Sequence, residues 1–350
     1  MTQQKILLAG ATGYVGGTVL NTLLNTNDAT IKKSPISVLV RGEESARLYE
    51  AKGLRTVQFK DDVAVTNAAR DHDVVINAAS GFDAEFATAL IRGLGQRKHD
   101  GGKTVHYIHT SGTTNYADSP ILNLYPNHEF GVFSDMCPQH IVSTLKQLNQ
   151  AVPYQQRSTD LAVLAAGKEA SVQTHTVCLP MIYGIGTGEG NKLTRQVPCL
   201  MQAAVKEGQA WIVGDGHGIK KHIHVEDAAR LYELILSRVL RGLAVPFGEE
   251  GVIFVESGEH SWSQVGKAIA ATGKKLGVLQ TDEVKSLGLK EATEKLGGGD
   301  EKYIELAFVS SARSSADVAR SLGWKPVHTE ESFWGSFEQQ WQVALQDLVK

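Results

Sequence analysis

The sequence predicts an α/β fold in which a doubly wound parallel sheet is joined to a smaller α/β domain. Two observations support this: a glycine-rich turn directly after the first apolar run, and short apolar runs that alternate with helical stretches. Neighbouring parallel strands need crossover connections, and helices between successive strands provide them. A chain of 350 residues is long enough for one large domain and one smaller one.

The glycine-rich turn lies in Lys5–Gly17, which reads KILLAGATGYVGG. Apolar residues before the turn indicate a strand, and apolar residues at helical spacing after it indicate an amphipathic helix. A helix N-terminus at such a turn presents backbone N–H groups to a dinucleotide diphosphate, and a Cβ at the closest point would block that approach. We therefore predict a dinucleotide pocket that begins with Gly10, Thr12, Gly13, Tyr14, Val15 and Gly16.

The same alternation continues along the chain. Apolar runs predict strands at Ile36–Val40, Thr56–Phe59, Val74–Ala78, Val105–His109, Thr176–Leu179 and His222–Val225. Helices are expected at Glu43–Lys52, Phe82–Arg97, Ile141–Gln150, Thr159–Gly167, Val197–Val205, Glu226–Leu236 and Ser261–Ala271. The long connection Thr113–Pro138, rich in Pro, Asn and Ser, is expected to form a loop over the carboxyl edge of the sheet, where such folds bind ligands.

The pattern divides the chain into a nucleotide-binding domain, a substrate domain and a C-terminal segment. We expect residues 1–180 and 220–245 in the first, residues 181–219 and 246–310 in the second, and residues 311–350 packed on the core. The glycine-rich Gly184–Asn191 opens the second domain. Apolar residues three or four apart between Trp334 and Leu348 predict a terminal helix laid against the core, in preference to a dimer seam, in a monomer or homodimer.

Composition excludes several classes of partner. A net charge of -3 provides no basic stripe for nucleic acid, and no apolar run approaches the roughly 20 residues that span a bilayer. Three widely spaced cysteines, Cys137, Cys178 and Cys199, suggest reduced thiols and a cytoplasmic protein. His222 and His224 share a face of a predicted strand, where packing is favoured over metal binding, so no metal is expected.

The end of the second predicted strand bears on the choice of nucleotide. NAD pockets usually place a carboxylate there for the ribose hydroxyls, whereas NADP pockets offer a cation to the 2′-phosphate. This strand ends in Arg41, although Glu43 and Glu44 follow closely. An arginine fork can bind a phosphate bidentately. The sequence therefore favours NADP (NADPH) over NAD, the alternative being that Arg41 is a solvated surface residue.

Five motifs occur in a familiar order: GATGYVGG, the strand end Asn77-Ala78-Ala79, HTSG at His109–Gly112, LPMIYG at Leu179–Gly184, and GDG with HIHVEDAA at Gly214–Ala229. Together they resemble the extended short-chain dehydrogenase/reductase superfamily, its NAD-dependent epimerase/dehydratase group, and more closely the atypical members found in fungi. The resemblance implies a Rossmann domain, a smaller C-terminal substrate domain and a nicotinamide cofactor across the strand ends. Further cofactor-binding residues that it implies are Asn77, Ala78, Ala79, Thr110, Pro180 and Ile182.

The catalytic residues of this family are not all present. Its chemistry uses a tyrosine, a lysine four residues on, and a serine or threonine, but no tyrosine here has lysine at that spacing. The expected pair falls in YQQRST, where Tyr154 with Ser158 and Gln155 with Thr159 are the two frames considered. Arg157 supplies a charge there, although a guanidinium stays protonated. The usual serine position is Gly112, which leaves Ser111 or Thr113.

The region before the HV motif also departs from the family. Members that act on nucleotide sugars often carry an arginine there, which grips the diphosphate, and Lys220 stands at the matching place. Lysine lacks the bidentate fork, so a nucleotide-sugar substrate is less favoured. His224 and Asp227 match the motif and are interpreted as structural.

The resulting hypothesis is an NADP(H)-dependent oxidoreductase that acts on a small carbonyl or alcohol compound. Ser111 or Thr113 would donate to the substrate oxygen, and Tyr154, Tyr183 or a water would supply the proton. For Tyr183, a ring packed between the two domains is the alternative. Two other hypotheses remain: a non-catalytic regulator that senses NADP(H), which the missing lysine favours, and an epimerase or isomerase.

Overall fold

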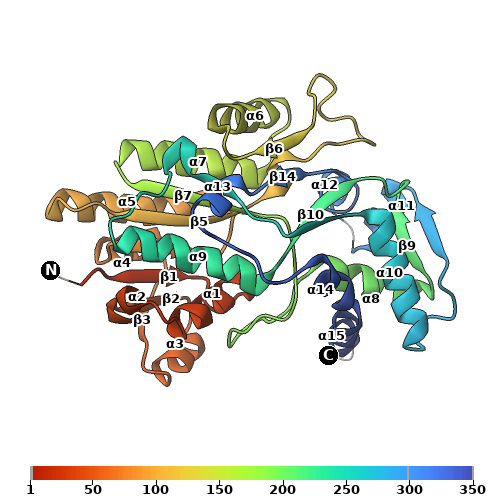
Figure 1. Ribbon diagram of the computed structural model, residues 1–350, viewed down its shortest axis with the longest axis horizontal. Coiled ribbons are helices and arrows are strands. Elements are labelled where there is room, and N and C mark those ends of the chain that lie inside the picture. The colour runs from red at the N-terminus through yellow and green to blue at the C-terminus, as the bar shows by residue number, and fades with distance from the viewer. Residues whose placement is uncertain (1–2, 298, 349–350) are drawn as a thin grey trace.

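The computed structural model describes residues 3–297 and 299–348. Its centre is a parallel seven-stranded sheet in the order β11-β7-β5-β4-β1-β2-β3 (Figure 1). The strands are β1 Ile6–Ala9, β2 Ile36–Val40, β3 Arg55–Gln58, β4 Val74–Asn77, β5 His106–Gly112, β7 Gln173–Leu179 and β11 Val252–Phe254. The order reverses beside β1, so the doubly wound prediction is confirmed, and ligands of such sheets bind at that reversal.

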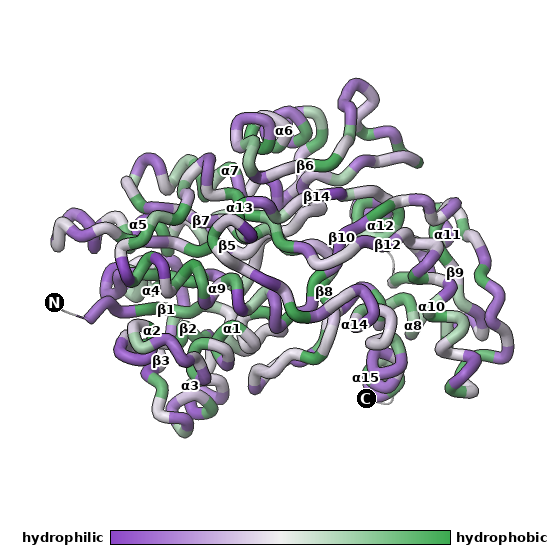
Figure 2. The backbone as a smooth tube through the Cα atoms, viewed as in Figure 1, coloured by the Kyte–Doolittle hydropathy of each residue, from purple (hydrophilic) through white to green (hydrophobic). Residues whose placement is uncertain are grey.

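Helices cover both faces of this sheet. Along β1, Ile6 and Leu8 pack with α1 Tyr14–Leu24 and α9 Val225–Leu240. The alternate residues Leu7 and Ala9 belong to a second apolar cluster with the helices of the other face. These helices are α4 Asp62–Arg70, α5 Ala84–Gly101 and α7 Gln155–Glu169. Burial on both faces explains why the central strands β1 and β4 read as nearly continuous apolar runs (Figure 2), whereas the edge strand β3 is half-exposed and more polar.

The second part of the molecule has its own apolar core, on the right in Figure 1. Its strands are β8 Met181–Tyr183, β9 Ala210–Val213, β10 Ile219–His224, β12 Gly258–Ser261 and β13 Val284–Leu287. Its helices are α8 Gln196–Glu207, α10 Trp262–Lys275, α11 Leu289–Lys295, α12 Glu301–Phe308, α14 Glu330–Gly335 and α15 Phe337–Leu348. The Trp341 indole in α15 donates to the Ile269 carbonyl oxygen of α10, so the terminal helix packs on this core.

Some elements depart from the expected ranges. β11, from the segment expected in the substrate domain, pairs with β7 at the edge of the large sheet. The Thr113–Pro138 connection contains the short helix η1 Thr113–Tyr116 and β6 Val132–Ser134, which pairs with β14 Arg313–Ser315. The remaining elements are α2 Ala29–Lys33, α3 Glu43–Glu50, α6 Pro138–Ala151, η2 Gly248–Gly251 and α13 Asp317–Ser321. None of the helices in the described part of the chain has the length and apolarity needed to cross a membrane.

The start of α7 differs most from the prediction. The helix begins at Gln155, four residues before the expected Thr159. The expected start was too late because the first turn is polar and shows no apolar period. Tyr154 is the extended N-cap residue. Residues 156 and 160 therefore lie on one face of the same helix, which the expected boundary does not allow.

Candidate active site

The glycine turn between β1 and α1 is shaped by contacts that exclude side chains. Gly10 has a φ of 92°, and a Cβ on it would lie 2.5 Å from the backbone of Ala78. A Cβ on Gly16 would overlap the Gly10 carbonyl oxygen. Gly13 caps α1 without any side-chain hydrogen bond, so the first N–H groups of the helix are open to a ligand. This cradle fits the diphosphate of a dinucleotide.

A cavity of about 330 Å³ extends from this turn toward the end of β2. It is lined in part by Gly10, Thr12, Gly13, Val40, Arg41, Ser45, Phe59 and Ala79. The Arg41 guanidinium lies 5.9 Å from the centre of the Phe59 ring, and no carboxylate of the described residues pairs with it. Glu43 pairs instead with Arg47, at 2.8 Å. The adenosine end of a nucleotide would thus meet an aromatic ring and a free cation.

The segment 184–192 lies across the outside of α1. The Tyr14 hydroxyl donates to the Gly184 carbonyl oxygen over 2.7 Å, and the Asn191 N–H donates to the Thr12 carbonyl oxygen over 2.8 Å. Glu189 forms an ion pair with Lys52 at 2.9 Å. The segment therefore holds the side chain of Tyr14, whose backbone forms part of the glycine turn.

Replacing Gly190 with alanine should loosen this segment. The new Cβ would lie 2.9 Å from the Thr12 Cα and closer still to its carbonyl oxygen, so the backbone must move. We expect a loss of about 1–3 kcal/mol in unfolding free energy, typical of overpacking, measured by urea titration. Gly131→Ala is the control, because no atom lies within 4 Å of its added Cβ. Equal stability of both variants would contradict this packing.

At the other end of the site, Gln156 of α7 lies beside the ends of two strands. A Cβ on Gly112, in β5, would lie 2.9 Å from the Gln156 Oε1, and one on Gly81, after β4, would lie 3.0 Å from its Nε2. Gln156 is 8% exposed. No hydrogen bond of its amide is found within residues 3–297 and 299–348. The absence of a side chain at these two glycines thus makes room for the Gln156 amide at the strand ends.

Asp160 follows one turn later on α7 and is buried. Its Oδ2 accepts from the Ser111 hydroxyl over 2.6 Å and from the Asn115 Nδ2 over 2.7 Å. The His109 Nε2 lies 3.4 Å from its Oδ1. Ser111 therefore directs its hydroxyl at α7, and Thr113 is buried at the start of η1. Gln156 and Asp160 have the four-residue spacing of the family's tyrosine and lysine.

Tyr154 and Arg157 do not form a paired acid and base. Tyr154 packs edge-on against Phe82, with ring centres 5.8 Å apart, and burial raises its pKa above the usual value despite the nearby Arg157. The buried Arg157 Nε donates to the Asn115 carbonyl oxygen over 2.9 Å, and the guanidinium lies over the rings of Tyr125 and Tyr154. Tyr154 thus keeps its proton at neutral pH.

Tyr183, in β8, is buried in the apolar core of the second part of the molecule. Its ring meets His222, His224 and Phe333 edge-on, and its hydroxyl donates to the Thr329 carbonyl oxygen over 3.3 Å. Burial raises its pKa. The ring is packed, but its ring contacts lie in the second part of the molecule and not between two domains. A part for Tyr183 in catalysis stays a prediction.

Other expected cofactor residues lie along the strand ends, several of them with partners inside the protein. The Asn77 Nδ2 donates to the Tyr107 hydroxyl over 2.8 Å, and its Oδ1 accepts from the Ala79 N–H. The Thr110 hydroxyl bonds that of Tyr232 at 2.7 Å, on the α9 face. Between β7 and β8, Pro180 is buried, and the Ile182 carbonyl oxygen accepts from the Thr194 hydroxyl.

Lys220, in β10, is buried against α12. Its Nζ donates to the Leu306 carbonyl oxygen of α12 over 3.0 Å, and burial lowers its pKa to about 7. The side chain of Glu305 in α12 accepts from the Ser119 hydroxyl and the Leu122 N–H, which fixes this helix over Lys220. The side chain of Lys220 is therefore enclosed between β10 and α12.

Replacing Lys220 with methionine should raise stability most at acid pH. Unfolded Lys220 stays protonated up to about pH 10.5, whereas the folded group loses its proton near pH 7, so the unfolded chain binds more protons between these values. The penalty for the buried charge is complete below pH 7 and shrinks as pH rises. We expect the gain in Tm to narrow from pH 6 to pH 10. A gain in Tm that does not change with pH would contradict the buried charge on Lys220. An equal gain in Lys221→Met would contradict it as well.

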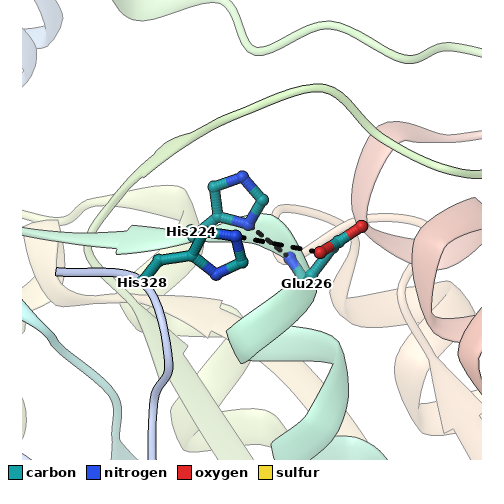
Figure 3. A group of neighbouring side chains, drawn as sticks. All are labelled: His224, Glu226 and His328. Carbon is teal, nitrogen blue, oxygen red and sulfur yellow. Dashed lines mark hydrogen bonds and ion pairs between the residues drawn. The ribbon is translucent and has the colours of Figure 1, made fainter. Parts of the chain in front are cut away.

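His224, Glu226 and His328 place their ligand atoms within 4.8 Å of one another (Figure 3). The two imidazoles stack with centres 3.5 Å apart and planes 13° apart, so their in-plane lone pairs run parallel instead of converging. The His224 Nδ1 accepts from the Glu226 N–H, and the His328 Nδ1 bonds Asp227. The cluster joins the start of α9 to the C-terminal segment, and we assign no metal to it.

The sequence analysis missed Gln156, Asp160 and Asn115. It considered pairs beginning at residues 154 and 155, whereas the structure brings residue 156 beside Gly112 and residue 160 beside Ser111. The signal in the sequence was Gly112, which stands where the family has its serine. A glycine there leaves the serine's role to another polar side chain.

Comparisons with known proteins agree with this architecture. A model of the NAD dependent epimerase/dehydratase family matches residues 6–245. The oxidase ucsJ of an Acremonium species is 26% identical over 93% of each chain. An uncharacterized protein of Schizosaccharomyces pombe is 23% identical over 93% of this chain and 96% of its own.

Solved structures share the fold at low identity. A double mutant of DesIV, a dTDP-glucose 4,6-dehydratase from Streptomyces venezuelae with NAD bound, is 15% identical over 96% of each chain, with a TM-score of 0.63. The UDP-glucose 4-epimerase of Thermus thermophilus, in complex with NAD, is 14% identical over 97% of this chain and 99% of that one, with a TM-score of 0.60. Together with the family match and the glycine turn, these findings place the chain in the NAD-dependent epimerase/dehydratase family.

Proposed function

We propose that the protein is an NADP(H)-dependent oxidoreductase that acts on a small carbonyl or alcohol compound. The observation that carries the proposal is the cavity that links the open N-terminus of α1 to Arg41. Backbone N–H groups after Gly13 would bind the diphosphate, and the Phe59 ring would contact the adenine end. When bound, the cofactor supplies or accepts a hydride at the strand ends.

In this oxidoreductase the proton does not come from the family's usual tyrosine. Gln156 and Asp160 have the spacing of the tyrosine–lysine pair, and neither an amide nor a buried carboxylate that accepts two hydrogen bonds can replace a phenol. A nucleotide-sugar substrate is disfavoured, because Lys220 is covered by α12. A small substrate is favoured because Lys220 is not available to bind the diphosphate of a nucleotide sugar.

The missing phenol also favours a protein that binds NADP(H) without turnover. One experiment separates the two functions: quenching of tryptophan emission by NADPH and NADH measures binding, and NADPH absorbance with a panel of carbonyl compounds measures turnover. Binding with turnover supports the oxidoreductase, and binding without turnover supports the regulator. Failure to bind either nucleotide would overturn both.

A further inference from the structure

Gln156 has the properties of a ligand-binding side chain. It is 8% exposed, and its amide makes no hydrogen bond to any described residue. A polar atom that is fully enclosed without a partner costs free energy. Neither atom of the Gln156 amide is among the enclosed unpaired atoms of the described residues, so the amide is accessible from outside. The amide lies against two glycines, at positions 81 and 112, where any side chain would displace it. The amide is therefore free to pair with a group that enters at the strand ends.

The polar side chains around Gln156 each interact with another group of the protein. On α7, Asp160 accepts from Ser111 and Asn115, and the Arg157 guanidinium donates to backbone and phenol oxygens. On α5, the N-cap residue Asp83 accepts from a backbone N–H. On β5, His109 lies against Asp160. The His109 Nε2, the Asn115 Oδ1 and the Asp160 Oδ1 have no hydrogen-bond partner, but these three atoms are fully enclosed. Neither atom of the Gln156 amide is among the enclosed unpaired atoms of the described residues, so the amide is the group that a substrate can reach.

We propose that the Gln156 Nε2–H binds the oxygen of an activated carbonyl substrate, such as a 1,2-diketone or an ortho-quinone. The inference rests on the proposed oxidoreductase function. The carbonyl carbon gains a hydride supplied by NADPH, and the C=O π pair stays on the oxygen, held by the amide. That oxygen then takes a proton from water and releases hydroxide, which gives the alcohol. An amide does not titrate, so it stabilises this oxygen without transferring a proton.

The class of substrate follows from the missing acid. A positioned proton donor is worth roughly 100- to 10,000-fold in rate, and a site without one loses that factor. The rate should fall most for unactivated ketones, because their reduction leaves a strongly basic oxygen. Neighbouring carbonyls or an aromatic product lower that barrier in diketones and quinones. The protein should therefore reduce 9,10-phenanthrenequinone and leave cyclohexanone unchanged.

The kinetic test uses the full chain with NADPH and 9,10-phenanthrenequinone from pH 6 to pH 9. We expect a flat kcat/KM profile for the wild type and a fall of roughly 10- to 100-fold in Q156A, the range for a hydrogen bond to a charged oxygen. Q156E should lose activity as pH rises, because only its protonated form can donate. The control Q155A should match the wild type, since the exposed Gln155 donates to the Phe82 carbonyl oxygen.

A binding measurement separates this inference from the proposed function. Isobutyramide, a carbonyl compound that NADPH does not reduce, is titrated calorimetrically into the NADPH-bound protein. We expect weaker isobutyramide binding to Q156A with unchanged NADPH affinity. Equal binding by Q156A and the wild type, a wild-type rate that falls at high pH, or no turnover of the quinone by an NADPH-binding protein would each overturn the role of Gln156. Failure to bind NADPH or NADH overturns the proposed function itself.

Discussion

Replacing Gly13 with aspartate should abolish NADPH binding while the fold stays intact. Gly13 is the N-cap of α1, with φ −83° and ψ 167°, a conformation that any residue adopts, and it has no side-chain cap. An added Cβ would lie 3.2 Å from the Gly10 carbonyl oxygen, a tight contact that the aspartate and asparagine variants share. Aspartate is among the best N-cap residues and stabilises a helix by about 1 kcal/mol. Its carboxylate would bond the same N–H groups that the diphosphate needs. We expect the affinity for NADPH to fall by at least ~100-fold, because an anion occupies the anion site.

Thermal unfolding with and without NADPH measures both effects together. The variant should keep or raise its Tm without nucleotide, and NADPH should no longer raise it. Gly13→Asn is the matched control, since it caps the helix without the charge and should lose less affinity. If the aspartate variant retains a nucleotide-dependent rise in Tm, the diphosphate does not bind at this helix.

The large sheet could be predicted from the sequence because its strands are buried on both faces. Ile6 and Leu8 pack on one side and Leu7 and Ala9 on the other, so the apolar signal is continuous. The second domain was less accessible to this reasoning. LPMIYG contains the end of β7 and the short β8, which belong to different sheets, and nothing in their hydropathy marks the break at Pro180.

The two ends of the candidate site also differed in how far the sequence could predict them. Its nucleotide end was predicted, because the glycines must stand at fixed spacing whatever surrounds them. Its substrate end was not, because the polar first turn of α7 hid the start of the helix by four residues. Contacts between segments far apart in the chain, such as Asn191 with Thr12 or Lys220 with Leu306, leave no local pattern in the sequence.

Arg41 should determine the preference for NADPH over NADH. Removing its guanidinium in Arg41→Ala should weaken NADPH binding by ~10- to 100-fold, since hydrogen bonds between charged groups are worth about 1.5–3 kcal/mol. NADH lacks the 2′-phosphate, so its affinity should change little. Tryptophan quenching by each nucleotide measures the two affinities. The NADPH value for the wild type should also fall as salt is added, because the contact is charged and exposed.

Arg47→Ala separates a specific contact from a general loss of positive charge. Arg47 lies six residues beyond Arg41, and its pair with Glu43 is exposed, with about three quarters of each side chain accessible (78% and 75%). Its removal changes the net charge by the same amount and should leave both affinities nearly unchanged. If Arg41→Ala weakens NADPH and NADH equally, then Arg41 acts through its packing on Phe59, and the case for the 2′-phosphate is lost. A selective loss of NADPH would instead mean that the fork at the end of β2 chooses the nucleotide.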